Sequence, residues 1–89
     1  MTMKYLVCAV RDRAADVFGQ PIFVNAKGSA IRSFSDEVNN PKKDSAIAAH
    51  PEDFDLYFLG YYDDADGSFE VSNRPEQIAI GKDLLVGRT

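Results

Sequence analysis

The run Asp-Leu-Tyr-Phe-Leu-Gly-Tyr-Tyr at residues 55–62 constrains the fold of this 89-residue chain more than any other stretch. Its aromatic residues favour a β-strand. Alternation along a strand predicts two apolar faces, with Leu56, Phe58, Gly60 and Tyr62 on one and Tyr57, Leu59 and Tyr61 on the other. A strand that is apolar on both faces is typical of the interior of a sheet, so we expect this strand to be central and covered on both sides.

An acidic turn and a return strand follow this run. The segment Asp63–Gly67 favours a hairpin turn, because Asp tolerates and Gly readily adopts left-handed backbone angles. Residues 68–71 alternate, which predicts an edge strand with Phe69 and Val71 pointing inward. The turn does not have EF-hand spacing: with Gly67 as the invariant glycine, the final ligand position would hold Asn73 rather than Glu. We therefore expect a solvated turn without a metal.

Two further strands are predicted before the central run. Residues 3–10 are β-favouring and apolar on both faces, which indicates an interior strand. The polar connection Arg11–Gly19 should lead to a short strand at residues 20–24, in which Pro21 fits only at the start or on an edge. We expect these two strands to form an antiparallel hairpin.

One main helix is predicted between the two pairs of strands, from Ala26 to Asn39. Its apolar stripe consists of Ile31, Phe34 and Val38, with Ala30 beside it. Asn25 is the expected N-cap, although Gly28 in the first turn leaves Ser29 as an alternative start.

The remaining segments are shorter and more polar. Residues 41–49 are expected to form a mobile loop, and Pro51–Asp53 a turn before the central strand. Residues 74–78 resemble a helical turn with Pro at its first position. Residues 80–86 are compatible with a last strand or with a docked apolar tail.

Together these elements predict a single α+β domain spanning residues 1–89. Its antiparallel sheet has about four strands, with one main helix packed on one face, in the order β-β-α-β-β followed by a short C-terminal element. An apolar content of 45% and a charged content of 27% are ordinary globular values. The sequence lacks a membrane-spanning apolar run and a signal peptide, so we expect a soluble intracellular protein.

The sequence shows no arrangement of residues typical of an enzyme. It has no Gly-rich phosphate loop and no Ser/His/Asp or Cys/His set. Cys8, the only cysteine, excludes an internal disulfide and is expected to be a buried, inert thiol. His50, the only histidine, is expected to be a satisfied structural residue. We therefore predict a protein without catalytic activity, metal or cofactor.

The charges are unevenly distributed along the chain. Residues 1–43 carry seven Lys and Arg against four Asp and Glu, whereas residues 44–89 carry three against ten. The net charge of −4 counts against general nucleic-acid binding, although a local basic patch remains compatible with it. The simpler interpretation is that both signs are solvated surface.

Three segments resemble the small nonstructural protein of gokushoviruses, which are tailless single-stranded DNA bacteriophages of the Microviridae. They are Gln20-Pro21-Ile22-Phe23; Gly28 to Phe34 with Val38-Asn39; and His50 to Phe54 continuing through Leu56-Tyr57, Gly60 and Asp63-Asp64. The resemblance implies a protein of the infected bacterial cytoplasm that is absent from the virion. It further implies assistance to viral DNA synthesis or to its switch to single-strand production.

Two hypotheses of function follow. The first is a single-stranded DNA-binding accessory protein, in which aromatic rings stack bases and basic side chains reach phosphates: Arg11, Arg13, Lys27, Arg32, Lys42 and Lys43. The second is a module that binds the phage replication initiator or a host factor through the acidic hairpin region, because eight of the fourteen acidic residues fall within residues 52–76. The tyrosines of the central strand are, alternatively, core and interface residues.

A homodimer is also expected. One helix covers one face of a small sheet, which leaves the partner-interface candidates Tyr57, Leu59 and Tyr61, or their opposite-face neighbours, as an exposed apolar patch. Pairing of two copies would bury this patch. The alternative is that residues 78–86 fold back and cover the second face within one chain.

Overall fold

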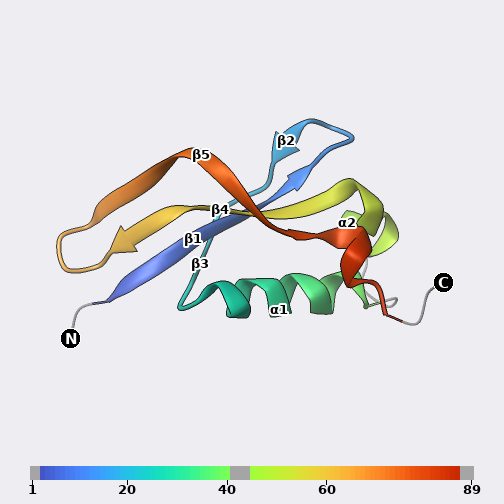
Figure 1. The fold of residues 1–89 in the computed structure, drawn as a ribbon, viewed down its shortest axis with the longest axis horizontal. Helices are drawn as coiled ribbons and strands as arrows, with labels where there is room; N and C mark the ends of the chain where they lie inside the picture. The colour runs from blue at the N-terminus through green and yellow to red at the C-terminus, as the bar shows by residue number, and fades with distance from the viewer. Residues whose placement is uncertain (1–2, 41–44, 87–89) are drawn as a thin grey trace.

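The computed structural model describes residues 3–40 and 45–86 and shows a five-stranded antiparallel sheet with one main helix beneath it (Figure 1). The central strands are β1 (Lys4–Asp12) and β4 (Phe54–Asp63). The long strand β5 (Ser68–Ile80) forms one edge, and the short strands β2 (Val17–Phe18) and β3 (Ile22–Val24) pair with the other side of β1. The predicted α+β class and the central position of residues 55–62 are thereby confirmed.

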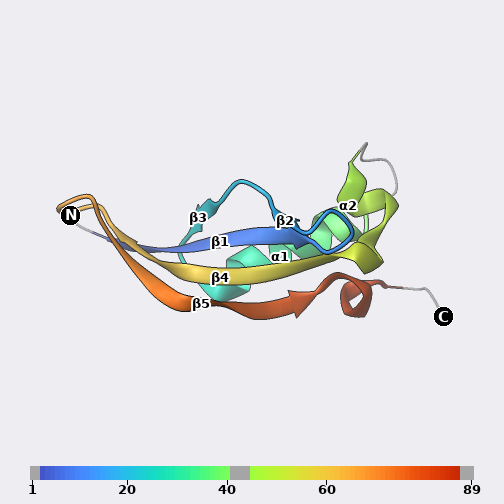
Figure 2. The same ribbon diagram turned by 90° about the horizontal axis from the view of Figure 1, so that it is seen from above.

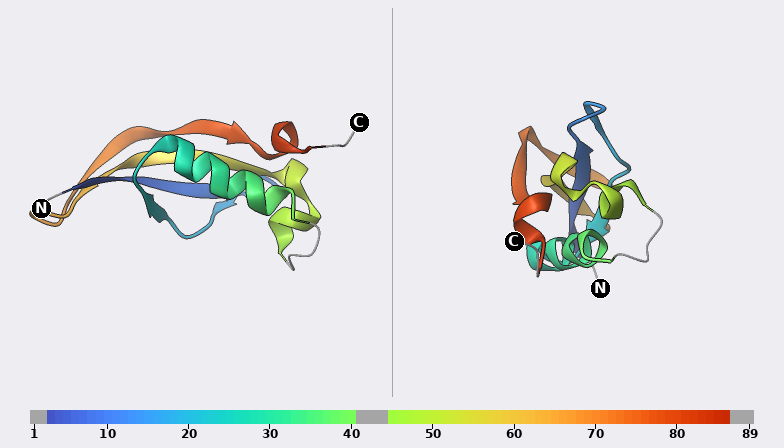
Figure 3. Two further views of the ribbon diagram at one scale, coloured as in Figure 1. Left: turned by 90° about the horizontal axis from the view of Figure 1, so that it is seen from below. Right: turned by 90° about the vertical axis from the view of Figure 1, so that its right-hand side faces the viewer.

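Helix α1 (Lys27–Val38) packs its predicted apolar stripe against one face of the sheet. Ala30, Phe34 and Val38 are each at most 4% exposed, and they contact Cys8 and Leu56 within one hydrophobic core. Burying a phenylalanine side chain of this kind contributes roughly 1.5–3 kcal/mol. All views place the helix on the same side of the strands, so no helix of residues 3–40 or 45–86 covers the opposite face of the sheet (Figures 2 and 3).

The start of α1 differs from both predictions. The N-cap is Ala26, whose backbone is extended (φ −155°, ψ 155°) and whose side chain makes no capping hydrogen bond. The Ala26 carbonyl accepts hydrogen bonds from the backbone N–H groups of Ser29 and Ala30. Asn25 therefore lies one residue too early to cap the helix, and Gly28 is accommodated within the first turn.

The connection between the first two predicted strands contains additional structure. β1 continues to Asp12, and a tight turn then leads into β2, which pairs Phe18 with Arg11. The Asp12 carboxylate stabilises this turn by accepting hydrogen bonds from the backbone N–H groups of Ala14 and Ala15. Pro21 directly precedes β3, as predicted, and the β1–β3 pairing is antiparallel.

Strand β5 is much longer than predicted. The expected return strand at residues 68–71 continues to Ile80, so the predicted helical turn at residues 74–78 is wrong. Gly60 of β4 pairs with Val71 and Phe58 pairs with Glu76, which leaves residues 72–75 outside the ladder as a bulge. Pro75 has no backbone N–H to donate, and an edge-strand bulge is where a sheet tolerates this residue.

The prediction that Phe69 and Val71 point inward is also wrong. They are 57% and 73% exposed. Phe69 pairs with Tyr62, and their rings lie 5.0 Å apart on the sheet face opposite α1. Because that face has no covering element in the described residues, alternation along β5 does not bury these side chains.

The C-terminal segment docks beside α1 rather than on the open face. The 3-10 helix η2 (Gly81–Leu84) lies near α1 (Figure 3). Its last residue, Leu84, and the following Leu85 both pack against the core. The Asn39 side chain donates to the Leu84 carbonyl at 2.8 Å and accepts from the Val86 N–H at 2.9 Å. Of the two predicted alternatives, the docked tail is confirmed, but it does not cover the second face.

The segment between α1 and β4 contains two short helical turns. The 3-10 helix η1 (Pro51–Asp53) confirms the predicted turn. The second, α2 (Ala46–Ala49), lies in the predicted mobile loop and is capped by the Ser45 hydroxyl; residues 41–44 of that loop lie outside the described residues. Among the described residues, no helix combines the length and apolar character needed to cross a membrane.

Candidate nucleic-acid interface

A bulge at Leu59 determines which aromatic rings of β4 share a face. Cys8 of β1 pairs with Phe58 and Val7 with Gly60, so Leu59 has no partner on β1. The alternation therefore shifts by one residue after Phe58.

This shift separates the three partner-interface candidates. Tyr61 packs against the helix-covered core, with its ring 5.2 Å from that of Phe58. Tyr57 instead contacts Phe18 on the face opposite α1. The prediction that Tyr57, Leu59 and Tyr61 form one surface is wrong, because the bulge places Tyr57 and Tyr61 on opposite faces.

The open face carries an aromatic group at the hairpin end of the sheet. Four rings form this group, here called the tip cluster: Tyr5, Phe23, Tyr62 and Phe69. Successive ring centroids lie 5.0–6.4 Å apart. Phe23 and Phe69 are more than half exposed. Four carboxylates lie on or next to the adjoining turn: Asp63, Asp64, Asp66 and Glu70.

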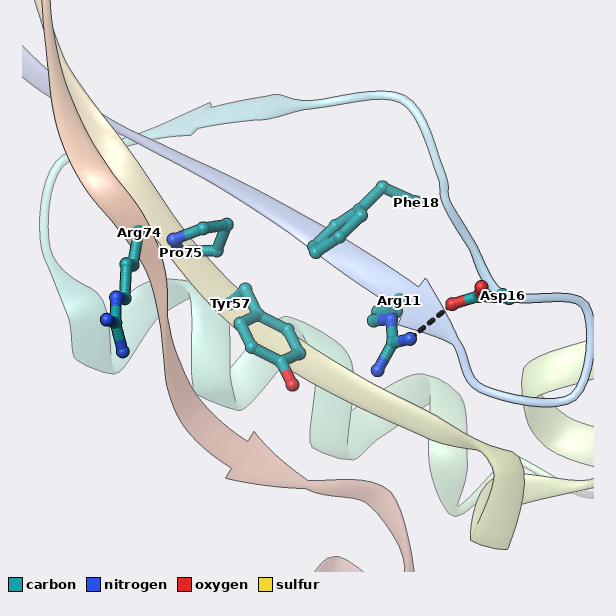
Figure 4. Close-up of a pocket in the computed structure, with 6 residues that line it drawn as sticks. All are labelled: Arg11, Asp16, Phe18, Tyr57, Arg74 and Pro75. Carbon is teal, nitrogen blue, oxygen red and sulfur yellow. Dashed lines mark hydrogen bonds and ion pairs between the residues drawn. The ribbon is translucent and has the colours of Figure 1, made fainter.

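A second group of side chains surrounds a hollow of about 430 Å³ further along the same face (Figure 4). This arginine hollow is lined by Arg11, Asp16, Phe18, Tyr57, Arg74 and Pro75. The Phe18 and Tyr57 rings meet edge to face, with centroids 5.3 Å apart. Figure 4 shows Tyr57 lying between Arg74 and Arg11, which come from β5 and β1. The fold thus brings together residues more than sixty positions apart in the sequence.

The two arginines differ in their partners. Arg11 forms an ion pair with Asp16, and this hydrogen bond is the main reason that the pKa of Arg11 lies above its ordinary value. Arg74 makes no ion pair with any residue in 3–40 or 45–86. The hollow therefore offers one guanidinium without an anionic partner and a second held by an exposed carboxylate.

A smaller hollow of about 230 Å³ is lined by Arg13, Asp55, Gln77, Ile80 and Lys82. Asp55 is only 2% exposed, and its Oδ2 lies 2.8 Å from Arg13 Nε. Its Oδ1 has no hydrogen-bond partner among the described residues. Asp55 lies two residues before Tyr57 in β4, which places both on the same face. The two hollows together carry four cationic groups against two carboxylates.

The six basic residues predicted to contact nucleic acid do not form one patch. Arg11 lies in the arginine hollow, whereas Arg13 is held by Asp55. Lys27 and Arg32 belong to α1, in the other layer of the fold. Lys42 and Lys43 lie outside the described residues.

Lys27 is also engaged locally. Its Nζ lies 4.9 Å from the Phe58 ring centroid and 3.3 Å from Glu76. Arg74 was not among the six predicted residues. Proline within a strand is typical of an edge strand or a bulge, so Pro75 could have indicated that the neighbouring Arg74 side chain is exposed.

The carboxylates of the hairpin turn make local hydrogen bonds. The Asp63 and Asp66 carboxylates accept backbone hydrogen bonds from Ala65 and Ser68, as in a solvated turn. The hydrogen bonds with Ser68 hold the pKa of Asp66 below its ordinary value.

Neither His50 nor Cys8 lines the arginine hollow or the smaller hollow. The His50 side chain is 65% exposed, and its Nδ1 lies 3.8 Å from Glu52 Oε1, so this histidine lies at the surface beside a carboxylate. His50, Glu52 and Asp53 bring their ligand atoms within 4.8 Å of one another, all at the surface or partly exposed. Cys8 is fully buried, as predicted.

The described residues thus define a small helix-backed antiparallel sheet whose second face presents aromatic rings and guanidinium groups. Comparison with known proteins identifies the family: residues 5–84 match the profile described as "Phage ORF5 protein", and the chain belongs to this family. It is 35% identical over 69 residues to Protein ORF5 of Chlamydia phage 1, a gokushovirus, covering 75% of this chain and 72% of that protein. No solved structure matches the chain.

Proposed function

We propose that this phage protein is a non-enzymatic accessory of viral DNA replication or single-strand synthesis that binds single-stranded DNA on the open face of its sheet. The observation that supports this proposal best is the position of Tyr57 between Arg11 and Arg74 (Figure 4). Sequence-independent binding of single strands combines aromatic rings that stack bases with cationic groups that follow the phosphates.

The distribution of charge on the open face favours DNA binding at the hollows rather than at the tip cluster. The two hollows carry four cationic groups, whereas the tip cluster is bordered by carboxylates that would repel phosphates. The net charge of −4 is thus compatible with local DNA binding, because the acidic turn between β4 and β5 lies far from β2 (Figure 2), and β2 supplies Phe18 to the arginine hollow. A strand would cross Tyr57 and the smaller hollow beside it.

Fluorescence anisotropy with a labelled single strand of ~20 nucleotides tests this proposal. Tyr57→Ala should weaken binding about fivefold or more, because stacking on an aromatic ring contributes roughly 1–3 kcal/mol per base. Arg74→Gln should weaken binding and make the dependence of log K on log salt shallower by about 0.7, the contribution of one phosphate contact to a single strand.

Lys27→Gln is the matched control, because it removes the same charge from the helix side of the fold. It should change the affinity less than Arg74→Gln does. Absence of binding at low salt, or equal losses in Arg74→Gln and Lys27→Gln, would contradict the proposal. Circular dichroism of each variant ensures that a loss of binding does not reflect unfolding.

The tip cluster supports a second candidate function, recruitment of a basic protein such as the phage replication initiator or a host factor. Phe23 and Phe69 are exposed aromatic residues next to four carboxylates, a combination suited to a partner with apolar and cationic side chains. Affinity capture of the phage's own replication initiator should then fail with Phe69→Ala and persist with Tyr57→Ala. The opposite pattern would contradict it.

A further inference from the structure

The Asp16 carboxylate occupies a position in the arginine hollow that suits a phosphate. It contacts Arg11 Nη2 and lines the same hollow as Tyr57. The Asp16 side chain is 79% exposed, so water, rather than protein, surrounds most of it. Carboxylates and phosphates present anionic oxygens to a guanidinium group in similar ways. In the free protein, Asp16 therefore makes a contact that DNA would otherwise make.

The backbone holds Asp16 in this position. Its φ of 57° lies in the left-handed region, which Asp and Asn adopt more readily than most residues. The preceding turn is fixed by the hydrogen bonds from Ala14 and Ala15 to Asp12, and β2 with Phe18 follows immediately. The acidic residue is thus placed by the same turn that positions one wall of the hollow.

We propose that the arginine hollow is a subsite for one nucleotide of a single strand, in which Asp16 mimics a backbone phosphate until the strand displaces it from Arg11. The inference rests on the proposed function. The base stacks on Tyr57 beside Phe18 and Pro75, and the phosphates on either side reach Arg11 and Arg74. Binding requires opening of the Arg11–Asp16 pair and leaves the Asp16 carboxylate close to the strand, so Asp16 lowers the affinity.

The substitution Asp16→Asn tests the inference, because Asn keeps the size and the left-handed backbone preference while removing the charge. In the anisotropy experiment at about 50 mM salt, its affinity for the ~20-nucleotide strand should rise about fivefold, the effect of one charge pair at close range in water. The salt dependence should steepen by up to about 0.7, because Arg11 then neutralises a phosphate without releasing a carboxylate.

Two matched variants isolate the effect. Asp36→Asn makes the same change in net charge on the exposed side of α1, and its affinity should stay within about twofold of the wild type, since charges beyond a Debye length are screened. The double variant Asp16→Asn with Arg11→Gln should bind no more tightly than Arg11→Gln alone, because the gain acts through Arg11.

Each outcome is decisive. An equal gain in Asp16→Asn and Asp36→Asn would show a general charge effect and overturn the subsite, while leaving the proposed function in place. The inference would likewise be overturned if Asp16→Asn still raised the affinity when Arg11 is replaced, or if Asp16→Asn bound the strand more weakly than the wild type. If no variant binds single-stranded DNA at low salt, the proposed function and the subsite fall together.

Discussion

The Nε atom of Arg13 lies 2.8 Å from Oδ2 of Asp55, a carboxylate that is almost completely buried. Arg13 directly follows β1, and its backbone N–H also donates to the Asp53 carbonyl at 2.8 Å. This arginine therefore joins the end of one central strand to the start of the other. Its role in the free protein is to hold the fold together, and we expect stability to depend on it.

Replacing Arg13 with methionine should lower the free energy of unfolding by about 2 kcal/mol, because it leaves the Asp55 charge buried and unpaired. The value lies below the range for fully buried pairs, since Arg13 is 45% exposed. Urea unfolding measures the change. Arg32→Met, on the exposed side of α1, is the control and should be near neutral; a similar loss in both would indicate that the ion pair contributes nothing specific.

The same substitution at two phenylalanines distinguishes the core from the open face. Phe34→Ala should lower the free energy of unfolding by roughly 3–5 kcal/mol, because it creates a cavity between α1 and the sheet. Phe69→Ala should lower it by less than about 1 kcal/mol, since that ring is more than half exposed. Equal losses in the two unfolding experiments would show that the tip cluster is a second core.

Two glycine substitutions should have opposite signs. A Cβ at Gly60, where φ is 154°, would lie 2.3 Å from the Glu70 carbonyl oxygen, so Gly60→Ala should destabilise the protein by at least about 1–3 kcal/mol. A Cβ at Gly28 meets nothing within 4 Å, and Gly28→Ala should stabilise α1 by about 0.5–1 kcal/mol. Thermal unfolding of both variants checks these signs, and a stabilised Gly60→Ala would refute the close approach of β4 and β5.

Burial raises the pKa of the Cys8 thiol above its ordinary value of 9.0. A group whose pKa is raised on folding favours the folded state as long as it is protonated in both states. This contribution is therefore present below pH 9 and is lost as the pH rises toward the folded pKa. We expect the stability of the wild type, relative to Cys8→Ala, to fall between about pH 8 and about pH 10. A pH-independent difference between the two unfolding curves would contradict this expectation.

The homodimer remains a prediction. As an alternative to recruitment of a basic protein by the tip cluster, we expect this cluster to form the dimer interface. Its exposed rings lie at the opposite end of the open face from the arginine hollow, so a dimer formed there leaves the proposed DNA subsite accessible. Light scattering at micromolar concentration should give about twice the monomer mass of 9.8 kDa, and Phe69→Lys should give the monomer. A wild-type mass near 9.8 kDa would rule the dimer out.

Local sequence patterns predicted the two elements that form most of the core. Residues 55–62 are apolar on both faces of the predicted strand, which placed β4 at the centre of the sheet. The spacing of Ile31, Phe34 and Val38 identified the buried side of α1. A single period describes the buried side of α1, whereas the alternation of β4 predicts its faces correctly only up to the bulge at Leu59.

The arginine hollow could not be predicted in this way. Arg11 and Arg74 come together only through the pairing of β1, β4 and β5, which no local pattern encodes. The edge strand also carried few apolar residues beyond Val71, and its proline favoured a helical turn over a bulge. Pro75 is compatible with β5 because residues 72–75 leave the ladder, a feature that depends on the neighbouring strand.

The bulge at Leu59 divides β4 into two parts, in which the odd-numbered side chains lie on opposite faces of the sheet. Counting in twos along the strand is valid on either side of this residue, but the count must restart after it. When related sequences are compared, an insertion or deletion of one residue between Phe58 and Tyr61 would therefore move the following side chains of β4 to the opposite face of the sheet. Such a change would turn Tyr62 toward the helix and Tyr61 toward solvent while leaving composition and hydropathy almost unaltered. In alignments of this family, the number of residues between Phe58 and Tyr61 therefore matters more than which residues they are.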